Sequence, residues 1–386
     1  MTNLSRRTFI AGAVAAGSAL SRAKGAMLEP TTADRNSPGS EIRALITQFS
    51  DRFQVPGISI ALARAEKLVF AAGYGVADDA ATPTPVNTDT LFRIASISKP
   101  ITSVAIFKLI EAGKLSLSDT VFGPAPSLFG DQYGVASGEV PNITINHLLT
   151  HTCGGWANNG SDPMFQHPQM NHQELITTTL KTHPLENKPG EKFAYSNFGY
   201  CVLGRVIEKL TSKQYDKAMM DLVLKPCGIQ DMRICGNTLA ERAPHETMYF
   251  SDAGKGDPYS LPAARMDSHG GWLATATDLV RFLTKVDGFA VSKDILNRAS
   301  IREMTTPPAV SPNYAHGWSV NSANNWWHTG SLPGTTTIAV RTSGHWCWAG
   351  LTNTRKPGSG MDLALDQLMW KISEHAAKLP ERDLFV

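Results

Sequence analysis

Apolar positions near the start of the chain follow first a helical and then a strand-like spacing. Residues 41–53 place apolar side chains three or four positions apart, which predicts an amphipathic helix. Apolar runs at 57–63 and 68–74, separated by a short charged stretch, predict a β-hairpin. Helical spacing returns at 98–113, where Gly113 ends the predicted helix.

Strand-like patterns return late in the chain, after a loop-rich middle. The middle, 114–265, contains helical stretches at 198–212 and 214–224, and a last amphipathic helix is predicted at 361–377. Short aromatic or β-branched runs between turn residues predict the late strands. These strands are 317–320, 325–329, 335–342 and 345–352.

Strands therefore flank a mainly helical middle. This arrangement predicts an α+β fold (an α/β sandwich), in which an antiparallel β-sheet built from both chain ends is flanked by helices and lies beside a mainly helical lobe. We expect one domain over 41–380, with 41–93 and 270–380 in the sheet lobe and 94–269 in the helical lobe.

The N-terminal segment predicts export rather than structure. Arg6-Arg7 precede a weakly apolar, Ala- and Gly-rich stretch, which is typical of a twin-arginine signal peptide over 1–26, cut near Ala26. The polar residues 27–40 then form a linker, and the mature protein is expected to be periplasmic or secreted. A cytosolic protein with a basic tail is the alternative.

Composition fits a soluble globular protein. The 386 residues are 42% hydrophobic and 18% charged, and no later apolar run is long enough for a membrane span. The first 26 residues carry four basic side chains and no acid, so 32 basic and 34 acidic residues remain after cleavage. Nothing in this balance favours a nucleic-acid partner.

The five cysteines leave disulfide pairing open. Cys227 and Cys235 are the best candidate pair, because they lie close together around a predicted turn. The odd count leaves at least one free thiol. Cys201 and Cys347 are equally typical of small buried apolar residues.

A Ser-x-x-Lys sequence, running from Ser96 to Lys99, opens the predicted helix at 98–113. Residues three apart share a helix face, so the Lys99 amine can reach the Ser96 hydroxyl at a helix end that favours developing negative charge. A serine hydroxyl needs a neighbouring base, and a lysine serves when burial lowers its pKa. Taken alone, the motif favours an N-capping serine with a solvent-facing lysine.

A second motif, Tyr195-Ser196-Asn197, precedes the apolar helix at 198–212. A tyrosinate held between cations could take the serine proton, or the phenol could pass a proton to the leaving group. Asn197 could bind a substrate amide and Lys99. Taken alone, the motif indicates only a helix N-cap.

A third motif, His328-Thr329-Gly330-Ser331, ends the predicted strand at 325–329. A strand beside a cleft can pair with a substrate backbone, and the small Gly330 would let the substrate approach closely. The backbone N–H groups of Ser331 and Ser96 would form an oxyanion hole, and Thr329 and His328 could bind a carboxylate.

The order and spacing of the three motifs resemble the serine β-lactamase and D,D-peptidase (penicillin-binding protein-like) superfamily. The branch resembled contains class C β-lactamases, D-alanyl-D-alanine carboxypeptidases and related esterases, and the resemblance covers about residues 40–375. The stretches that carry it are 91–99, 148–152, 188–191, 195–197, 270–279 and 328–331.

The resemblance implies a β-lactamase/transpeptidase-like fold and a set of site roles. Ser96 would be the acylated nucleophile, and Lys99 and Tyr195 would handle its proton. The remaining implied roles are substrate binding by Asn197, His328, Thr329 and Gly330, and an oxyanion hole from Ser96 and Ser331. His328 replaces the lysine of many β-lactamases, which favours the carboxypeptidase and esterase side, and Cys153 replaces a common serine.

Two other catalytic patterns are weaker. Gly57-Ile58-Ser59-Ile60-Ala61 lacks the last glycine of G-x-S-x-G and lies in an apolar run, so we interpret it as core. His147 and His151 are four apart, but Leu148 stands where a zinc protease has glutamate, so we interpret both histidines as structural.

These observations predict a serine hydrolase that forms an acyl-enzyme and acts on a small-molecule amide, ester or peptide. A D,D-carboxypeptidase-like or related peptidase or amidase is favoured, with a carboxylesterase or a class C-like β-lactamase as alternatives. A penicillin-acylated sensor that never deacylates is the non-enzymatic alternative. We expect no metal and no cofactor, and the oligomeric state stays open.

Overall fold

The computed structural model describes residues 38–252, 254–380 and 382–385. The predicted export signal and the predicted linker up to residue 37 lie outside the described residues. Helix α2 (Pro38–Phe53) begins slightly before the predicted start at 41.

A six-stranded antiparallel sheet forms the centre of the fold, in the order β2-β1-β9-β8-β7-β6. Strands from the two ends of the chain meet where β1 pairs with β9, so the expected α+β fold is confirmed. The strands are β1 (Gly57–Arg64), β2 (Lys67–Gly75), β6 (Ser319–Val320), β7 (Trp326–Leu332), β8 (Thr335–Arg341) and β9 (Trp346–Thr352).

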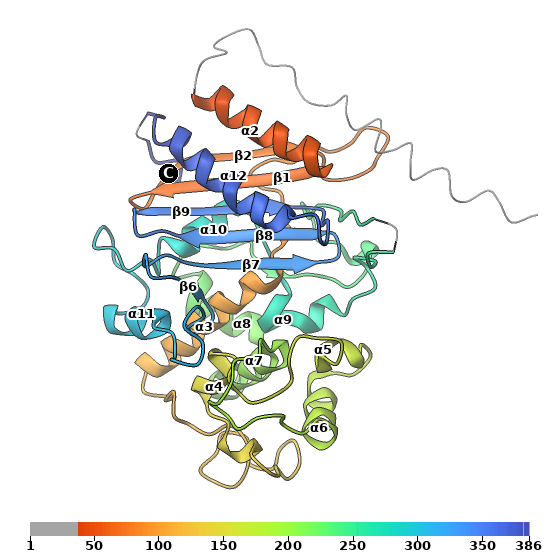
Figure 1. Cartoon of the computed structure of the whole chain (residues 1–386), viewed down its shortest axis with the longest axis vertical. Helices are drawn as coiled ribbons and strands as arrows, with labels where there is room; N and C mark the ends of the chain where they lie inside the picture. The colour runs from red at the N-terminus through yellow and green to blue at the C-terminus, as the bar shows by residue number, and fades with distance from the viewer. Residues whose placement is uncertain (1–37, 253, 381, 386) are drawn as a thin grey trace, which may run out of the picture.

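Helices cover both faces of this sheet, as Figure 1 shows. On one face, alternate β1 residues such as Ile58 and Ile60 pack with apolar side chains of α2 and α12 (Met361–Ala376). On the other face, the intervening Ala61 and Ala63 join the larger core with α10 (Ala276–Leu283). Burial on both faces explains why β1 reads as an unbroken apolar run. Ser59, in the G-x-S-x-G-like stretch, lies in this strand and is 1% exposed.

A helical lobe lies beside the β7 side of the sheet (Figure 1). Its elements come mainly from the middle of the chain. They are α3 (Ser98–Glu111), α4 (Ile145–Leu149), α5 (Pro163–Gln166), α6 (His172–Thr182), α7 (Asn197–Thr211), α8 (Tyr215–Met219), α9 (Asp267–Gly270) and α11 (Arg298–Thr305). The predicted helix at 214–224 divides into α8 and a π-helical turn, Met220–Leu224.

A small second sheet connects the two regions and was missed by the sequence pattern. It has the order β3-β5-β4, with β3 (Phe92–Arg93), β5 (Trp272–Ala274) and β4 (Arg233–Ile234). Strands of two or three residues are too short to show alternation. Strand β3 leads directly to the turn that carries Ser96, so this sheet positions the start of the site.

The third motif lies inside β7 rather than at a strand end. The expectation of a strand that ends at Thr329 is wrong, because pairing with β8 continues to Leu332 opposite Thr335. The chain turns only at Pro333-Gly334. The strand predicted at 317–320 is shorter in the structure, where β6 contains only Ser319 and Val320. Gly317 has a positive φ of 85°, which is not a β-strand conformation.

All five cysteines are buried free thiols, so the candidate Cys227–Cys235 disulfide is wrong. Cys227 packs in the large core, whereas Cys235 packs in a separate cluster with Leu91 and Leu273. Cys201 and Cys347 are buried, as expected for small apolar side chains. Of the described helices, none has the length and apolar character that crossing a membrane requires.

Candidate active site

Ser96 lies in a tight turn that leads into α3. The turn is a 3₁₀ helix, Ala95–Ile97, and Ala95 has a positive φ of 49°, which is unfavourable for a residue with a side chain. Residue 99 is one turn further along, and the Lys99 Nζ lies 3.1 Å from Ser96 Oγ. The structure therefore contains the predicted contact between the hydroxyl and the amine.

Lys99 is fully buried, and two acceptors take its hydrogens. Its Nζ lies 2.8 Å from Asn197 Oδ1 and 2.8 Å from the carbonyl oxygen of His269. Neither oxygen can donate a hydrogen bond, so Lys99 donates to both. Burial holds the pKa of Lys99 well below its ordinary value, although the Asp162 carboxylate acts in the opposite direction.

Tyr195 comes from the loop before α7 and completes this cluster. Its hydroxyl hydrogen-bonds the Ser96 side chain, and Lys99 Nζ lies 4.8 Å from the centre of its ring. Burial raises the pKa of the phenol. The raised pKa favours the neutral phenol over the tyrosinate in the resting site.

Asp162 is a site residue that the sequence analysis missed. It is 1% exposed, and its Oδ2 accepts a hydrogen bond of 2.8 Å from Asn197 Nδ2. Its Oδ1 caps α5 by accepting from the backbone N–H of Met164. The sequence Asp162-Pro163 is typical of a helix start, but nothing in it indicates a contact with the second motif.

The third motif reaches the site through β7. Because a two-residue hairpin closes at Leu332–Thr335 and antiparallel pairs alternate, Ser331 directs its N–H away from β8, toward the open side of the strand. An added Cβ on Gly330 would lie 2.2 Å from the Ile94 carbonyl oxygen. The expectation that Gly330 makes room for substrate is therefore wrong, because it makes room for the backbone before the Ser96 turn.

A chain of hydrogen bonds joins His151, Tyr314 and His328 behind Tyr195. His151 Nδ1 accepts from the Ser196 N–H at 3.1 Å, so its Nε2 carries the hydrogen and donates to Tyr314 at 3.2 Å. The His151 ring lies 4.2 Å from the Tyr195 ring. His147, in contrast, accepts from the Thr144 N–H as part of the cap of α4.

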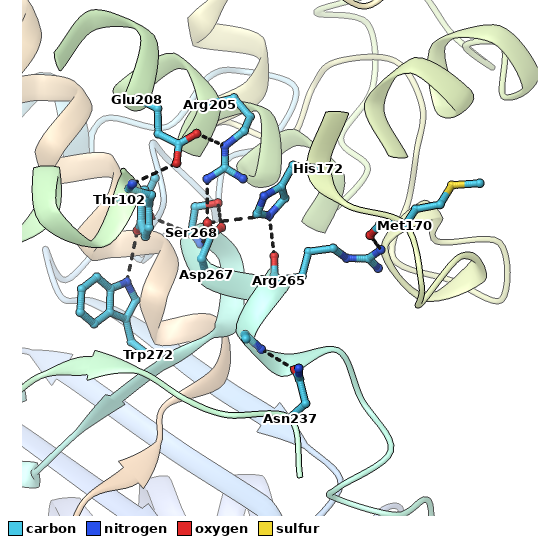
Figure 2. A network of polar contacts seen from close by, with 12 residues as sticks. Thr102, Met170, His172, Arg205, Glu208, Asn237, Arg265, Asp267, Ser268 and Trp272 are labelled. Atoms are coloured by element: carbon cyan, nitrogen blue, oxygen red, sulfur yellow. Dashed lines mark hydrogen bonds and ion pairs between the residues drawn. The ribbon is translucent and has the colours of Figure 1, made fainter. Parts of the chain in front are cut away.

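A second network of polar contacts, drawn in Figure 2, surrounds Asp267 and Ser268 in α9, the short helix whose His269 carbonyl contacts Lys99. Asp267, at the start of α9, pairs with Arg205 at 2.6 Å, and Arg205 also pairs with Glu208 at 2.7 Å. Thr102 donates to the carbonyl of Ser268 at 2.6 Å. Although burial raises it, the Arg205 pairing brings the pKa of Asp267 below its ordinary value. These contacts fix the short helix whose His269 carbonyl faces Lys99.

An open cavity of about 590 Å³ lies above Ser96 and Tyr195. His328, Thr329 and Ser331 line one wall, and Tyr314 also contributes to the lining. Lys99 and Asn197 lie beneath the cavity, and Gly330 packs against Ile94. Among the described residues, no three His, Cys, Asp or Glu side chains gather as metal ligands would.

Comparison with known proteins assigns the chain to a family. The Beta-lactamase family model matches residues 42–368. Protein flp of Staphylococcus aureus is 26% identical over 303 residues, which cover 77% of this chain and 59% of that relative. The chain therefore spans less than two thirds of the length of the flp protein.

Two solved structures show the same fold. A D-amino acid amidase from Ochrobactrum anthropi superposes with a TM-score of 0.72 at 23% identity, covering 88% of this chain and 98% of that one. An octameric penicillin-binding protein homologue from Pyrococcus abyssi gives a TM-score of 0.69 at 24% identity, covering 89% and 79%. Because the family match extends over most of its length, the chain belongs to the Beta-lactamase family.

Proposed function

We propose that the chain is a serine hydrolase that forms an acyl-enzyme on Ser96 and acts on a small amide or ester. The hydrogen bonds of Lys99 carry the proposal. A neutral amine has two hydrogens, and Asn197 Oδ1 and the His269 carbonyl accept both. The remaining lone pair of Lys99 then points to Ser96 Oγ, as general-base catalysis requires.

In the acylation step, Ser96 Oγ forms a bond to the substrate carbonyl carbon while its proton moves to Lys99 Nζ. The carbonyl oxygen becomes an oxyanion, which the backbone N–H groups of Ser96 and Ser331 stabilise. When the tetrahedral intermediate collapses, the bond to the leaving group breaks. Tyr195 gives its phenolic proton to that leaving group, and the proton that Lys99 took from Ser96 then restores the phenol, so both groups return to their starting states.

Deacylation uses the same groups with water as the nucleophile. Water gives a proton to the neutral Lys99 amine and attacks the ester carbonyl, and the proton returns to Ser96 Oγ as the acid leaves. The protein finishes with its starting protonation states, and the net reaction is the addition of water across one amide or ester bond.

A substrate panel on purified protein tests the proposal. It contains a D-Ala-D-Ala peptide, a chromogenic cephalosporin, a short-chain p-nitrophenyl ester and a D-amino-acid amide. We expect steady turnover of at least one member and its loss in Ser96→Ala. Intact-mass measurement followed by peptide mapping should place the acyl group on the peptide containing Ser96.

Two results would contradict the proposal in different ways. Unchanged activity in Ser96→Ala would remove the nucleophile assignment. A single stoichiometric burst with every substrate, and no later turnover, would instead indicate an acylated sensor.

A further inference from the structure

The cavity above Ser96 has an uncharged lining. Its walls consist of Ser, Thr, Asn, Tyr, Phe, Val, Pro and His side chains, and no Lys, Arg, Asp or Glu of the described ranges is among them. Lys99 lies below the floor with no exposed surface, and its hydrogens are held by Asn197 and His269. A charged substrate group entering this cavity would lose water without gaining an ionic partner.

His328 is the side chain in these walls whose ordinary pKa lies closest to neutral pH, and its contacts select one tautomer of the neutral ring. Its Nδ1 lies 2.6 Å from the Thr329 carbonyl oxygen, which can only accept, so Nδ1 carries the hydrogen. Its Nε2 lies 3.1 Å from the hydroxyl of Tyr314. The Tyr314 hydroxyl accepts from His151, and its own hydrogen can go to His328 Nε2 or to the Tyr200 side chain, with which it also forms a hydrogen bond.

The surroundings of His328 also favour its neutral form. Burial, reinforced by the nearby Lys99, lowers the pKa of His328 to about 3. The same two causes hold the pKa of His151 well below its ordinary value. The strand wall therefore presents no positive charge at neutral pH, at the position where the sequence analysis considered carboxylate binding.

We propose that this cavity selects substrates that are uncharged around the scissile bond, namely neutral amides and esters, over peptides and lactams that carry a free carboxylate there. The inference rests on the proposed serine-hydrolase function and narrows its substrate class. It follows from the uncharged lining and from the hydrogen-bonded neutral form of His328.

Three acetate esters of similar shape separate charge from size. They are 3-tert-butylphenyl acetate, 3-acetoxybenzoate and 3-acetoxy-N,N,N-trimethylanilinium, and each kcat/KM is normalised to the ester's own hydroxide-catalysed hydrolysis. We expect the neutral ester to exceed both ions by about tenfold or more, because an unpaired ion must be desolvated. An equal or higher normalised value for the anion would overturn the proposal.

Added charges then test whether the lining sets this preference. Asn158 is exposed and lines the cavity, so Asn158→Lys should raise the anion-to-neutral ratio by about fivefold. Leu363→Lys adds the same charge on α12, where residue 363 is 63% exposed, and should leave the ratio unchanged. His328→Lys, if it folds, should raise the ratio further. A ratio that moves equally in Leu363→Lys, or not at all in Asn158→Lys, would overturn the inference.

The controls separate this inference from the proposed function. If Ser96→Ala hydrolyses all three esters at the wild-type rate, the acyl-enzyme proposal fails, whatever the charge preference. If Ser96→Ala is inactive and the wild type prefers the anion, the serine hydrolase stands and only the substrate-class inference fails.

Discussion

Asp162 Oδ2 accepts a hydrogen bond of 2.8 Å from the Asn197 side chain, and this contact decides which end of the amide faces Lys99. A carboxylate only accepts, so the amide nitrogen faces Asp162 and Oδ1 faces the amine. Lys99 must then donate to Asn197, which leaves its lone pair for Ser96. Asp162 thus orients the general base without lining the cavity.

The first prediction concerns the acid limb of the pH profile. The Asp162 carboxylate raises the pKa of Lys99, against the larger lowering by burial. Asp162→Asn removes that charge, so the pKa of Lys99 falls further and the acid limb of kcat/KM should move to lower pH. Profiles of wild type and variant on one neutral ester measure the shift. A limb that stays in place or moves to higher pH would contradict the role given to Lys99.

The second prediction tests the close packing of β7 against the nucleophile turn. In Gly330→Ala the new Cβ would lie 2.2 Å from the Ile94 carbonyl, so the Ser96 turn must shift. We expect kcat/KM to fall by about 10²-fold, with the secondary structure by circular dichroism retained. Gly344→Ala is the matched control, because the closest atom to its Cβ lies 3.8 Å away. Similar losses in both variants would refute the steric explanation.

A third prediction concerns the buried ion pair behind α9. Asp267→Asn leaves the buried Arg205 guanidinium with the partly exposed Glu208 in place of two carboxylates, and urea unfolding should show the free energy of unfolding reduced by about 3 kcal/mol. The depressed pKa of Asp267 means that its stabilisation is present above the ordinary carboxyl pKa and is lost as pH falls through the folded value. Asp221→Asn, which breaks exposed pairs with Lys213 and Lys225, should leave the urea midpoint nearly unchanged.

The fourth prediction concerns Asp287, whose contribution to stability depends on pH in the opposite sense to that of Asp267. Burial, with Glu66 and Asp294 nearby, raises the pKa of Asp287 to about 7. Its contribution is therefore fully present below the ordinary carboxyl pKa and is lost as pH rises through about 7. Asp287→Asn should stabilise the fold at pH 8, by on the order of a few kcal/mol, and much less at pH 4. Thermal unfolding at both pH values, with the exposed Asp362→Asn as a charge control, checks this sign.

The catalytic cluster was predictable where chemistry depends on side chains at short spacing. The Ser96–Lys99 contact follows from helical periodicity, and Tyr195 from the resemblance of its motif. The acceptor on His269 was not predictable, because every residue has a backbone carbonyl and no side-chain type marks this one. Asp162 was missed because the pattern around it is only that of a helix cap, and its partner is set by the tertiary fold.

The fold was predictable where a strand extends over several residues. Strands β1, β2, β8 and β9 lie close to their expected positions, because each is a run of seven or more residues, rich in apolar, aromatic or β-branched side chains and bounded by turn residues. Strands β3, β4 and β5 are too short for that signal. The Cys227–Cys235 expectation used separation in sequence, whereas the chain places the two thiols in different clusters.

The pairing of β1 with β9 has a consequence for when the protein can fold during synthesis. The backbone N–H of Gly57 donates to the side chain of Asn353, 296 positions later. Strand β1 is synthesised early, but its partner β9 is synthesised near the end of the chain. The sheet therefore cannot be completed until nearly the whole chain has emerged from the ribosome. Nascent chains stalled before residue 346 should therefore remain sensitive to protease, and protection should appear late and abruptly.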